Sequence, residues 1–411
     1  MTAPDVQDAV GTDRVLPRLP GRVTFVVAAG SLLCVFVAAG SPISLFNLYR
    51  HHGLSGAVIA SAAVLYFVAA AFSLLVLGRL SDHLGRRPVA IVAVLSSAAG
   101  TLLLTQVDGP QPLLLGRVFQ GLACGAASGT LGAFVVDTAP ARPRWLPALV
   151  VGSAPMLGIP VGAVGAGVLV EYAPAPRVLA YLIVSAALVL GAALLLAAPE
   201  SIRRRPGAIR SLLPRFVVPA GSGRLMFAAG SAYVATWAVG GFFQAFGPTV
   251  AEQQLGSANA VVAAAVFASI MILNPLGGPL GGGLSPTAGL RIGIAAYLAA
   301  IAGVLLALEF SATVPFFLAA LLAGIAQGVI STGGNRALLA ATDSDERAGL
   351  LSTLFLISYC GAALPGLVAG QVADHLSVVQ IALGYVLLGS LGCLAAFIGA
   401  PPGRRRSRCC G

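Results

Sequence analysis

Long apolar runs separated by short polar connections dominate the chain. A helix needs about 20 predominantly apolar residues to cross the hydrocarbon core of a bilayer. Twelve runs reach or approach that length, and they occupy residues 23–46, 55–77, 88–106, 112–136, 145–170, 177–198, 224–247, 258–282, 290–308, 314–337, 348–370 and 376–399. A helix satisfies its own backbone hydrogen bonds in lipid. The pattern therefore predicts an all-α membrane protein with twelve transmembrane helices.

Composition changes the picture by excluding several functions. Of the 411 residues, 58% are hydrophobic and 9% are charged, whereas a soluble domain carries roughly a quarter charged residues. All 24 basic residues are Arg, so the chain can hold neither a Lys-containing P-loop nor a Lys Schiff base. The four His lack metal-ligand spacing, and no run contains a cluster of catalytic side chains. We expect no enzyme activity, no cofactor and no metal site.

The Arg residues are distributed unevenly between the two sides of the membrane. An even number of spans places both termini on one side, and that side carries 21 of the 24 Arg residues. The other side carries Arg50 and Arg177, while Arg117 falls inside a run. The positive-inside rule predicts that both termini are cytoplasmic and that the protein lies in the cell's inner (cytoplasmic) membrane. The net charge of +10 follows from this topology, so we expect no nucleic-acid partner.

The longest connection divides the chain into two halves. We predict a cytoplasmic tail, a six-helix bundle, a cytoplasmic loop, a second six-helix bundle and a basic cytoplasmic tail. Their boundaries are 1–22, 23–198, 199–223, 224–399 and 400–411.

Two motifs recur at equivalent places in these halves. Residues 78–87 read Gly-Arg-Leu-Ser-Asp-His-Leu-Gly-Arg-Arg and residues 282–291 read Gly-Gly-Leu-Ser-Pro-Thr-Ala-Gly-Leu-Arg, so five of ten positions match. The Gln-Gly pair at 120–121 recurs at 327–328. Paired, pseudo-symmetric six-helix repeats are a transporter architecture, with the substrate path between the repeats near the bilayer midplane.

These motifs resemble the major facilitator superfamily, particularly its twelve-helix branch of drug/proton antiporters. The loop 78–87 carries the resemblance most specifically, and Arg117-x-x-Gln120-Gly121 is similar to the family's fourth-helix motif. The fifth run is similar to the antiporter motif but has Ala163 where the family has Pro. The resemblance implies a secondary active transporter of a small organic molecule, and we expect an exporter that works by alternating access.

The sequence leaves other functions open. An importer or facilitator of a metabolite would use the same fold, as would a non-transporting receptor. Protons are a candidate coupling ion, although the 14 acidic residues all lie in tails, connections or span ends and coupling usually needs a titrating group at depth. The expected partners are the lipid bilayer, a small-molecule substrate and, with coupling, protons. We expect a monomer.

The resemblance implies that the loop 78–87 is a conformational latch between the two halves. Gly78 and Gly85 allow a tight turn, and the Asp82 carboxylate can pair with a guanidinium. The residues assigned to this latch are Gly78, Asp82, Gly85, Arg86, Arg87 and Asp137. The family pattern suggests that Asp137 joins the Arg residues of the loop. The alternative is a solvated loop beside an ordinary interfacial acid.

Arg117 is the charged residue that lies clearly inside a run. Burying a guanidinium in the bilayer costs at least about 2.5–3.5 kcal/mol on insertion scales, so a function is the default hypothesis. Helical spacing puts Arg117, Gln120 and Gly121 along one face, and we assign them to transport or coupling. The alternative is that Arg117 snorkels to the outer headgroups.

Two further groups are weaker candidates. Gly158, Gly162 and Gly167 give the fifth helix a small-residue face for close packing, whether this packing is static or lets the bundles move. Polar or amphipathic side chains inside the runs are candidates for lining a substrate cavity, although each can equally satisfy a local hydrogen bond. They are Tyr66, Tyr233, Trp237, Gln244, Asn274 and Tyr359.

Overall fold

A computed structural model describes residues 19–399, apart from residues 144, 204, 205, 214, 215, 217, 220, 344, 345 and 374. The predicted tail 400–411 and most of the predicted tail 1–22 lie outside the described residues. Within the described residues, twelve helical segments are long and apolar enough to cross a membrane. The predicted all-α membrane fold is therefore confirmed.

The N-terminal bundle is built from six membrane-length segments and the short helices that join them. Its elements are α1 (Gly21–Gly40), η1 (Ile43–Leu45), α2 (Phe46–His51), α3 (Gly56–Leu77), α4 (Ser81–Leu84), α5 (Arg86–Leu103), η2 (Leu104–Gln106), α6 (Pro110–Thr138), α7 (Leu146–Tyr172) and α8 (Leu179–Leu196). The short helix α9 (Ala208–Ser211) lies in the connection to the second bundle.

The C-terminal bundle repeats this arrangement. Its elements are α10 (Gly223–Gln253), α11 (Ala260–Ile272), η3 (Asn274–Leu276), α12 (Gly277–Gly282), α13 (Pro286–Glu309), α14 (Thr313–Ala340), α15 (Arg347–Val372) and α16 (Val378–Gly399). Several helices extend beyond the apolar runs that predicted them. For example, α10 continues six residues past the end of the run at 224–247.

Two of the spans are interrupted, and proline is present at each interruption. The first span runs from Gly21 to His51 and changes to a 3-10 turn after Pro42. The eighth runs from Ala260 to Gly282 and changes at η3, which contains Pro275. Proline has no backbone N–H and crowds the preceding turn, so a regular helix does not continue unchanged through it.

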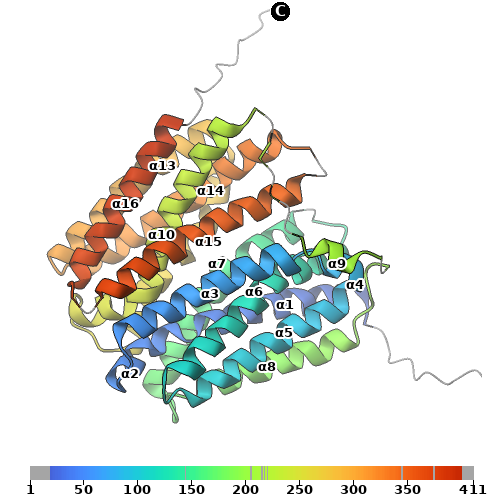
Figure 1. The fold of residues 1–411 in the computed structure, drawn as a ribbon, viewed down its shortest axis with the longest axis horizontal. Coiled ribbons are helices and arrows are strands. Elements are labelled where there is room, and N and C mark those ends of the chain that lie inside the picture. The colour runs from blue at the N-terminus through green and yellow to red at the C-terminus, as the bar shows by residue number, and fades with distance from the viewer. Residues whose placement is uncertain are drawn as a thin grey trace, which may run out of the picture.

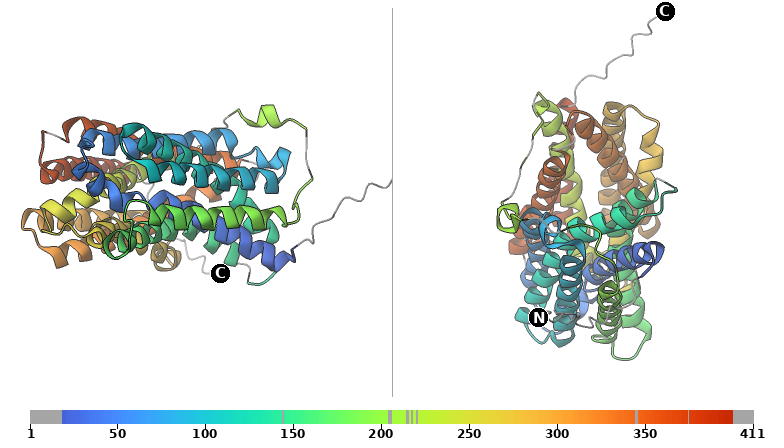
Figure 2. Two further views of the ribbon diagram at one scale, coloured as in Figure 1. Left: turned by 90° about the horizontal axis from the view of Figure 1, so that it is seen from below. Right: turned by 90° about the vertical axis from the view of Figure 1, so that its right-hand side faces the viewer.

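The helices form two bundles that lie side by side and run between the same two ends (Figures 1 and 2). α3 packs along α15 and α7 packs along α11, so these pairs join the bundles. We call the end with residue 19, the loop 78–87 and residue 399 the basic end. The end with residues 52–55 and 254–259 is the far end. Many large apolar side chains on the outside are exposed, as expected for a surface that faces lipid.

Candidate functional site

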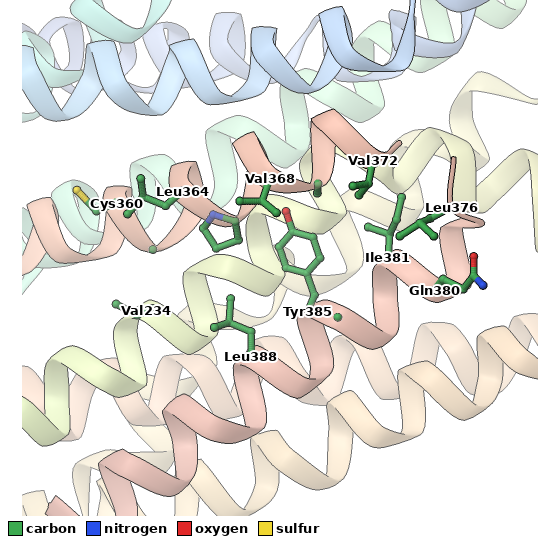
Figure 3. A pocket seen from close by; sticks show the side chains of 14 residues that line it. Val234, Cys360, Leu364, Val368, Val372, Leu376, Gln380, Ile381, Tyr385 and Leu388 are labelled. Carbon is green, nitrogen blue, oxygen red and sulfur yellow. The ribbon is translucent and has the colours of Figure 1, made fainter. Parts of the chain in front are cut away.

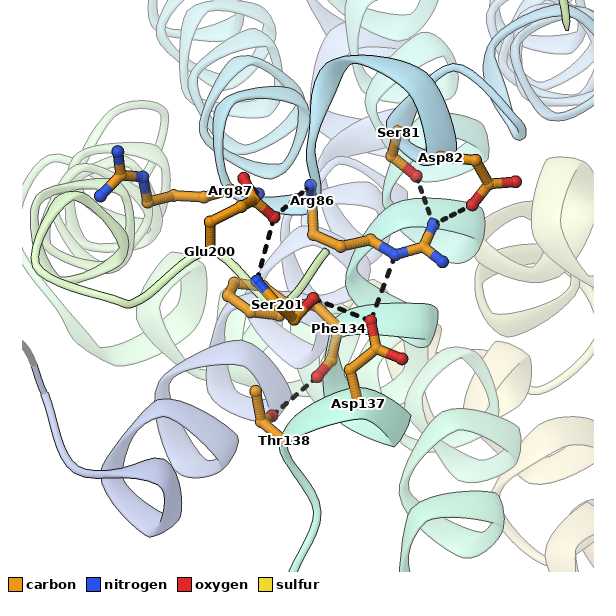
Figure 4. A network of polar contacts seen from close by, with 9 residues as sticks. All are labelled: Ser81, Asp82, Arg86, Arg87, Phe134, Asp137, Thr138, Glu200 and Ser201. Atoms are coloured by element: carbon orange, nitrogen blue, oxygen red, sulfur yellow. Dashed lines mark hydrogen bonds and ion pairs between the residues drawn. The ribbon is translucent and has the colours of Figure 1, made fainter. Parts of the chain in front are cut away.

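A cluster of charged and polar side chains occupies the basic end of the N-terminal bundle (Figure 4). The Arg86 guanidinium lies at its centre and donates through Nη1 to Asp82 Oδ1, at 2.5 Å, and to Ser81 Oγ, at 2.8 Å. Its Nε donates to Asp137 Oδ2 over 3.3 Å. The structure therefore places Asp137 beside an Arg of the loop, where the family pattern puts it.

Glu200 completes this cluster at the start of α5. Its carboxylate accepts hydrogen bonds from the backbone N–H of Arg86, at 2.7 Å, and of Arg87, at 3.2 Å. A carboxylate at a helix N-terminus satisfies orphan N–H groups and interacts favourably with the helix dipole. A side chain at Gly85 would place its Cβ 2.5 Å from Glu200 Oε2, and the Gly85 φ of 102° also favours glycine. The turn therefore needs glycine at this position.

Glu200, the first acid after the sixth run, was not among the predicted site residues. Ser201 was missed as well, and its hydroxyl donates to Asp137 Oδ2 over 2.8 Å. These two residues connect the end of α8 to the loop 78–87. Their position at the start of the Arg-rich connection 199–223 was the available signal.

The contacts of the cluster differ from the predicted latch between the two halves. Among the described residues, the side chains of Asp82, Arg86, Arg87 and Asp137 contact one another, α4, the last residue of α8 and the segment after it. All of these elements belong to the N-terminal half of the chain. In this conformation the cluster therefore stabilises the basic end of one bundle, because its charges are satisfied there.

Arg117 lies in the interior of the N-terminal bundle and does not snorkel. Its side chain is fully buried. Nη1 donates to Ala39 O at 2.8 Å and to Gln120 Oε1 at 2.9 Å, while Nε donates to Ala62 O at 3.3 Å. The guanidinium also lies over the ring of Tyr66, 4.4 Å from its centroid. Arg117 thereby ties α6 to α1 and α3.

Gln120 and Gly121 complete this buried site. The Gln120 amide donates to Ala38 O at 2.8 Å and to Thr101 Oγ1 at 3.2 Å. A Cβ at Gly121 would lie 2.5 Å from Tyr66 O. The structure therefore brings the predicted triad together, but as a packed polar core rather than as part of a cavity wall.

A central cavity of about 60 Å³ lies between the two bundles. The N-terminal bundle contributes residues of α1, α3 and α7 to its walls, and the C-terminal bundle contributes residues of α10, α11, α14 and α15. The lining residues are Phe36, Tyr66, Phe67, Pro155, Met156, Ile159, Trp237, Gly240, Gly241, Gln244, Ile270, Met271, Gln327 and Tyr359. It is mostly apolar and aromatic, as ligand cavities commonly are.

Four of the six predicted cavity residues line this cavity, namely Tyr66, Trp237, Gln244 and Tyr359. Tyr233 and Asn274 are not among the described residues that line it, so these two predictions are corrected. The Tyr233 hydroxyl donates to Asn335 Oδ1 at 2.7 Å and is satisfied within the bundle. Asn274 lies in the η3 interruption, where its carbonyl group packs against Gly328.

Gln327 also lines the cavity and was not predicted to do so, although the Gln-Gly repeat contains it. Apolar lining residues such as Phe36 and Met156 carry no signal that separates them from other residues of an apolar run. Their position at the bundle interface is visible only in the packed structure.

Polar contacts between the bundles gather at the far end in the described part of the chain. Asn47 Nδ2 donates to Pro248 O at 2.7 Å, and Arg50 Nη1 donates to Thr249 Oγ1 at 2.7 Å. His51 Nε2 lies 3.4 Å from Glu252 Oε1. In addition, Glu171 accepts from Ala260 N at 3.1 Å. The far end is therefore held closed by side chains of both bundles.

The three predicted packing glycines of α7 contact different neighbours. A Cβ at Gly158 would lie 2.6 Å from Phe36 Cβ, and one at Gly162 would collide with the Val37 carbonyl. These two positions pack α7 on α1 within one bundle. A Cβ at Gly167 would instead lie 2.8 Å from Ala260 O in the other bundle. Gly167 alone of the three therefore lies at a surface between the bundles.

A cavity of about 570 Å³ forms a groove on the outside of the C-terminal bundle (Figure 3). It lies between α15 and α16, beside Val234 of α10. Leu364 and Val368 on its rim are 61% and 68% exposed, so they face lipid in a membrane. Every lining residue belongs to one bundle. The groove is therefore not positioned on a path between the bundles.

Comparison with known proteins agrees with this architecture. The sequence profile of the Major Facilitator Superfamily matches residues 26–307. The nucleoside transporter NupG, solved as a mutant, superposes with a TM-score of 0.71 at 14% identity over 93% of this chain and 100% of that chain. That likeness concerns the fold alone.

Partial similarity extends to two resistance proteins. The multidrug resistance protein MdtL of Klebsiella pneumoniae subsp. pneumoniae is 32% identical over 102 residues, which are 25% of this chain and 26% of that protein. The class H tetracycline resistance protein of Pasteurella multocida is 30% identical over 139 residues, which are 34% of this chain and 29% of that protein. The alignments thus span less than a third of either relative.

Proposed function

The chain belongs to the major facilitator superfamily, and from this premise we propose that it exports a small organic molecule by alternating access. It is a membrane transporter rather than an enzyme. The basic end faces the cytoplasm in this proposal, because that end carries most of the Arg residues. The cell membrane is the expected location.

The central cavity is the observation that carries the proposal. It is bounded by both bundles, so a movement of one bundle against the other changes its access. The far end is closed by contacts from Asn47, Arg50 and Glu171 to the opposite bundle. Substrate would therefore enter from the basic end and leave after these contacts break.

Export rather than import is supported by the partial similarity to two resistance proteins. Resistance is a property of those two proteins, and the similarity of this chain to them favours transport out of the cell. The apolar and aromatic lining also suits an organic compound better than an ion.

Proton coupling would act at the far end in this proposal. No acid is among the described residues that line the central cavity. By contrast, Glu171 and Glu252 each contact the opposite bundle. A carboxylate that takes up a proton is a weaker acceptor, so protonation from the far side would favour opening.

Reversible locking of the far end tests alternating access. Cβ atoms at position 167 and on Ala264 would lie 3.3 Å apart, close to the spacing that a disulfide requires. In a background without the natural Cys, we expect oxidised Gly167→Cys/Ala264→Cys protein to lose transport in inside-out vesicles and to recover it with dithiothreitol. The two single variants are the controls. Transport that continues in fully cross-linked protein would contradict the proposal.

The direction and the coupling ion are tested in the same vesicles with a panel of organic compounds. Accumulation inside inside-out vesicles that collapses with the pH gradient would support proton-coupled export. Accumulation only in right-side-out vesicles would instead show an importer.

A further inference from the structure

Two buried amides face the central cavity. Gln244 is 4% exposed and Gln327 is 8% exposed, and both line the cavity. Neither side chain forms a hydrogen bond to a described residue, whereas the buried amide of Gln120 is fully engaged. Buried polar groups are normally hydrogen-bonded, and leaving one unpaired is costly. These amides are therefore free to bind a polar edge of a ligand.

The remaining walls are flat and aromatic. Trp237 and Tyr359 are in edge contact with their centroids 5.3 Å apart, and Phe67 lies 6.1 Å from Tyr359. Tyr66 lies 5.4 Å from Phe67. Aromatic side chains favour stacked or edge contacts with another ring. These walls suit a planar, apolar ring system in a conformation in which the two bundles have moved apart, because the cavity of about 60 Å³ in the present conformation is smaller than such a compound.

The charge around the cavity disfavours a cation. Behind the wall, the Arg117 guanidinium lies 4.4 Å from the centroid of Tyr66. The hydrogen bonds that Arg117 makes to described residues all go to neutral oxygens, so no carboxylate neutralises it there. In a low-dielectric interior this positive charge repels a second one.

An anion is disfavoured for a different reason. Arg117 is fully buried and is not among the residues that line the cavity, so it cannot make a direct ion pair with a ligand there. Charged groups lose strong hydration on entering an apolar site and need a close partner to offset that loss. Amide N–H groups offer less compensation than a guanidinium.

We propose that the central cavity selects uncharged planar compounds with an amide-like edge, which Gln244 and Gln327 recognise. Each glutamine amide offers one acceptor and two donors, so it can pair with a neighbouring donor and acceptor on the ligand. This inference rests on the proposed transport function and specifies its substrate class.

Three compounds of almost identical shape provide the test. 2-Naphthamide is neutral, 2-naphthamidine is a cation at neutral pH and 2-naphthoate is an anion. Binding to the purified full chain is followed by quenching of Trp237 fluorescence after Trp145→Phe removes the other Trp. We expect 2-naphthamide to bind about tenfold or more tightly than either charged analogue, because the charged forms lose hydration without gaining an ion pair.

Substitutions of the two amides sharpen this test. Gln327→Leu and Gln244→Leu should each weaken 2-naphthamide binding about tenfold. Gln106→Leu replaces an exposed amide outside the cavity and should leave binding unchanged. Gln327→Glu should reverse the preference towards 2-naphthamidine, because a carboxylate pairs with the amidinium.

Several results would overturn the inference. One is that either charged analogue binds as tightly as 2-naphthamide, or more tightly, to the protein that retains both glutamines. Another is that both Leu variants bind 2-naphthamide as tightly as that protein does. The third is that 2-naphthamide does not bind at all. The inference and the proposed function fail separately. A vesicle panel in which only cations are exported would support a carrier but reject this substrate class, whereas a panel in which no compound is transported would reject the proposed function.

Discussion

The fourth helix of each bundle carries a Gln-Gly pair, yet α6 and α14 use the pair differently. In α6, Gln120 is locked between Arg117, Ala38 and Thr101. In α14, Gln327 lines the central cavity and has no hydrogen bond to a described residue. The position that matches Arg117 in this repeat is Gly324.

Gly324 explains why the second glutamine is available. A Cβ at Gly324 would collide with the carbonyl of Ile270, so the backbones of α14 and α11 approach there and no arginine fits. Without a guanidinium beside it, Gln327 has no internal partner of the kind that holds Gln120. In α6 the pair therefore belongs to a buried polar network. In α14 the amide of Gln327 faces the cavity and is available to a ligand.

The glycine of the pair, by contrast, serves the same purpose in both bundles. Gly121 approaches the Tyr66 carbonyl of α3, and Gly328 approaches the Asn274 carbonyl of η3. In each case the fourth helix of a bundle packs closely on the second. Close helix approach in membranes depends on such small residues.

The largest expected effect comes from removing the arginine that distinguishes the two sites. Arg117→Leu should destabilise the protein by about 3 kcal/mol, because the Ala39 and Ala62 carbonyls and the Gln120 amide lose their donor. Transport should fall to background. Thermal unfolding in detergent and vesicle transport measure the two effects. Arg117→Lys should be intermediate, and an unchanged melting temperature in Arg117→Leu would refute the structural part of this role.

The shared glycines should respond alike. Gly121→Ala and Gly328→Ala should each cost about 2 kcal/mol through overpacking against a backbone carbonyl. Gly165→Ala is the matched control, since nothing lies within 4 Å of a Cβ there. The measurement is the thermal unfolding midpoint in detergent, compared among the three variants. A large loss in only one of the two repeats would break the symmetry inferred here.

The glutamines should differ in their effect on stability. Gln120→Leu should cost about 1–2 kcal/mol, because it removes partners from a buried network. Gln327→Leu should change the stability by less than about 0.5 kcal/mol, because no internal hydrogen bond is lost. The same unfolding measurement applies to both. Equal destabilisation would mean that Gln327 has an internal partner after all.

Only a small stability effect is expected at the loop cluster, where the charges are partly exposed. Asp137→Asn and Asp82→Asn should each cost less than about 1 kcal/mol, as surface ion pairs contribute little. We nevertheless expect transport to fall severalfold while membrane insertion stays normal, since these pairs hold α4, α5 and α6 together. Asp108→Asn at the far end is the control. Full transport in both loop variants would remove the functional role of the cluster.

The fold was largely predictable because hydrophobic length and motif repetition are local properties. Each of the twelve segments overlaps an apolar run, and the loop 78–87 indicated the family. The bounds were less accurate where charge or proline adjoined a run. The first span, for example, continues beyond the end of its run at residue 46 to His51 and so includes Arg50.

The candidate site was predictable only in part. Tyr66, Trp237, Gln244 and Tyr359 were found because amphipathic side chains stand out in an apolar run. Tyr233 stands out equally, but the hydroxyl contacts Asn335. Residue type and position in the sequence do not distinguish a side chain that forms its hydrogen bond with a neighbouring helix from one that faces a cavity.

The sequence by itself determined that this chain crosses a membrane as paired bundles of helices, because each apolar segment meets the length and hydrogen-bonding demands of lipid on its own. Only the tertiary structure decided that Arg117 is covered by Tyr66, that the far end is closed, and that Gln327 rather than Gln120 faces the cavity. The physical reason is that burial and hydrogen-bond satisfaction depend on helices distant in sequence. Identical dipeptides in two similar helices acquired different surroundings, and those surroundings fix what each amide can bind.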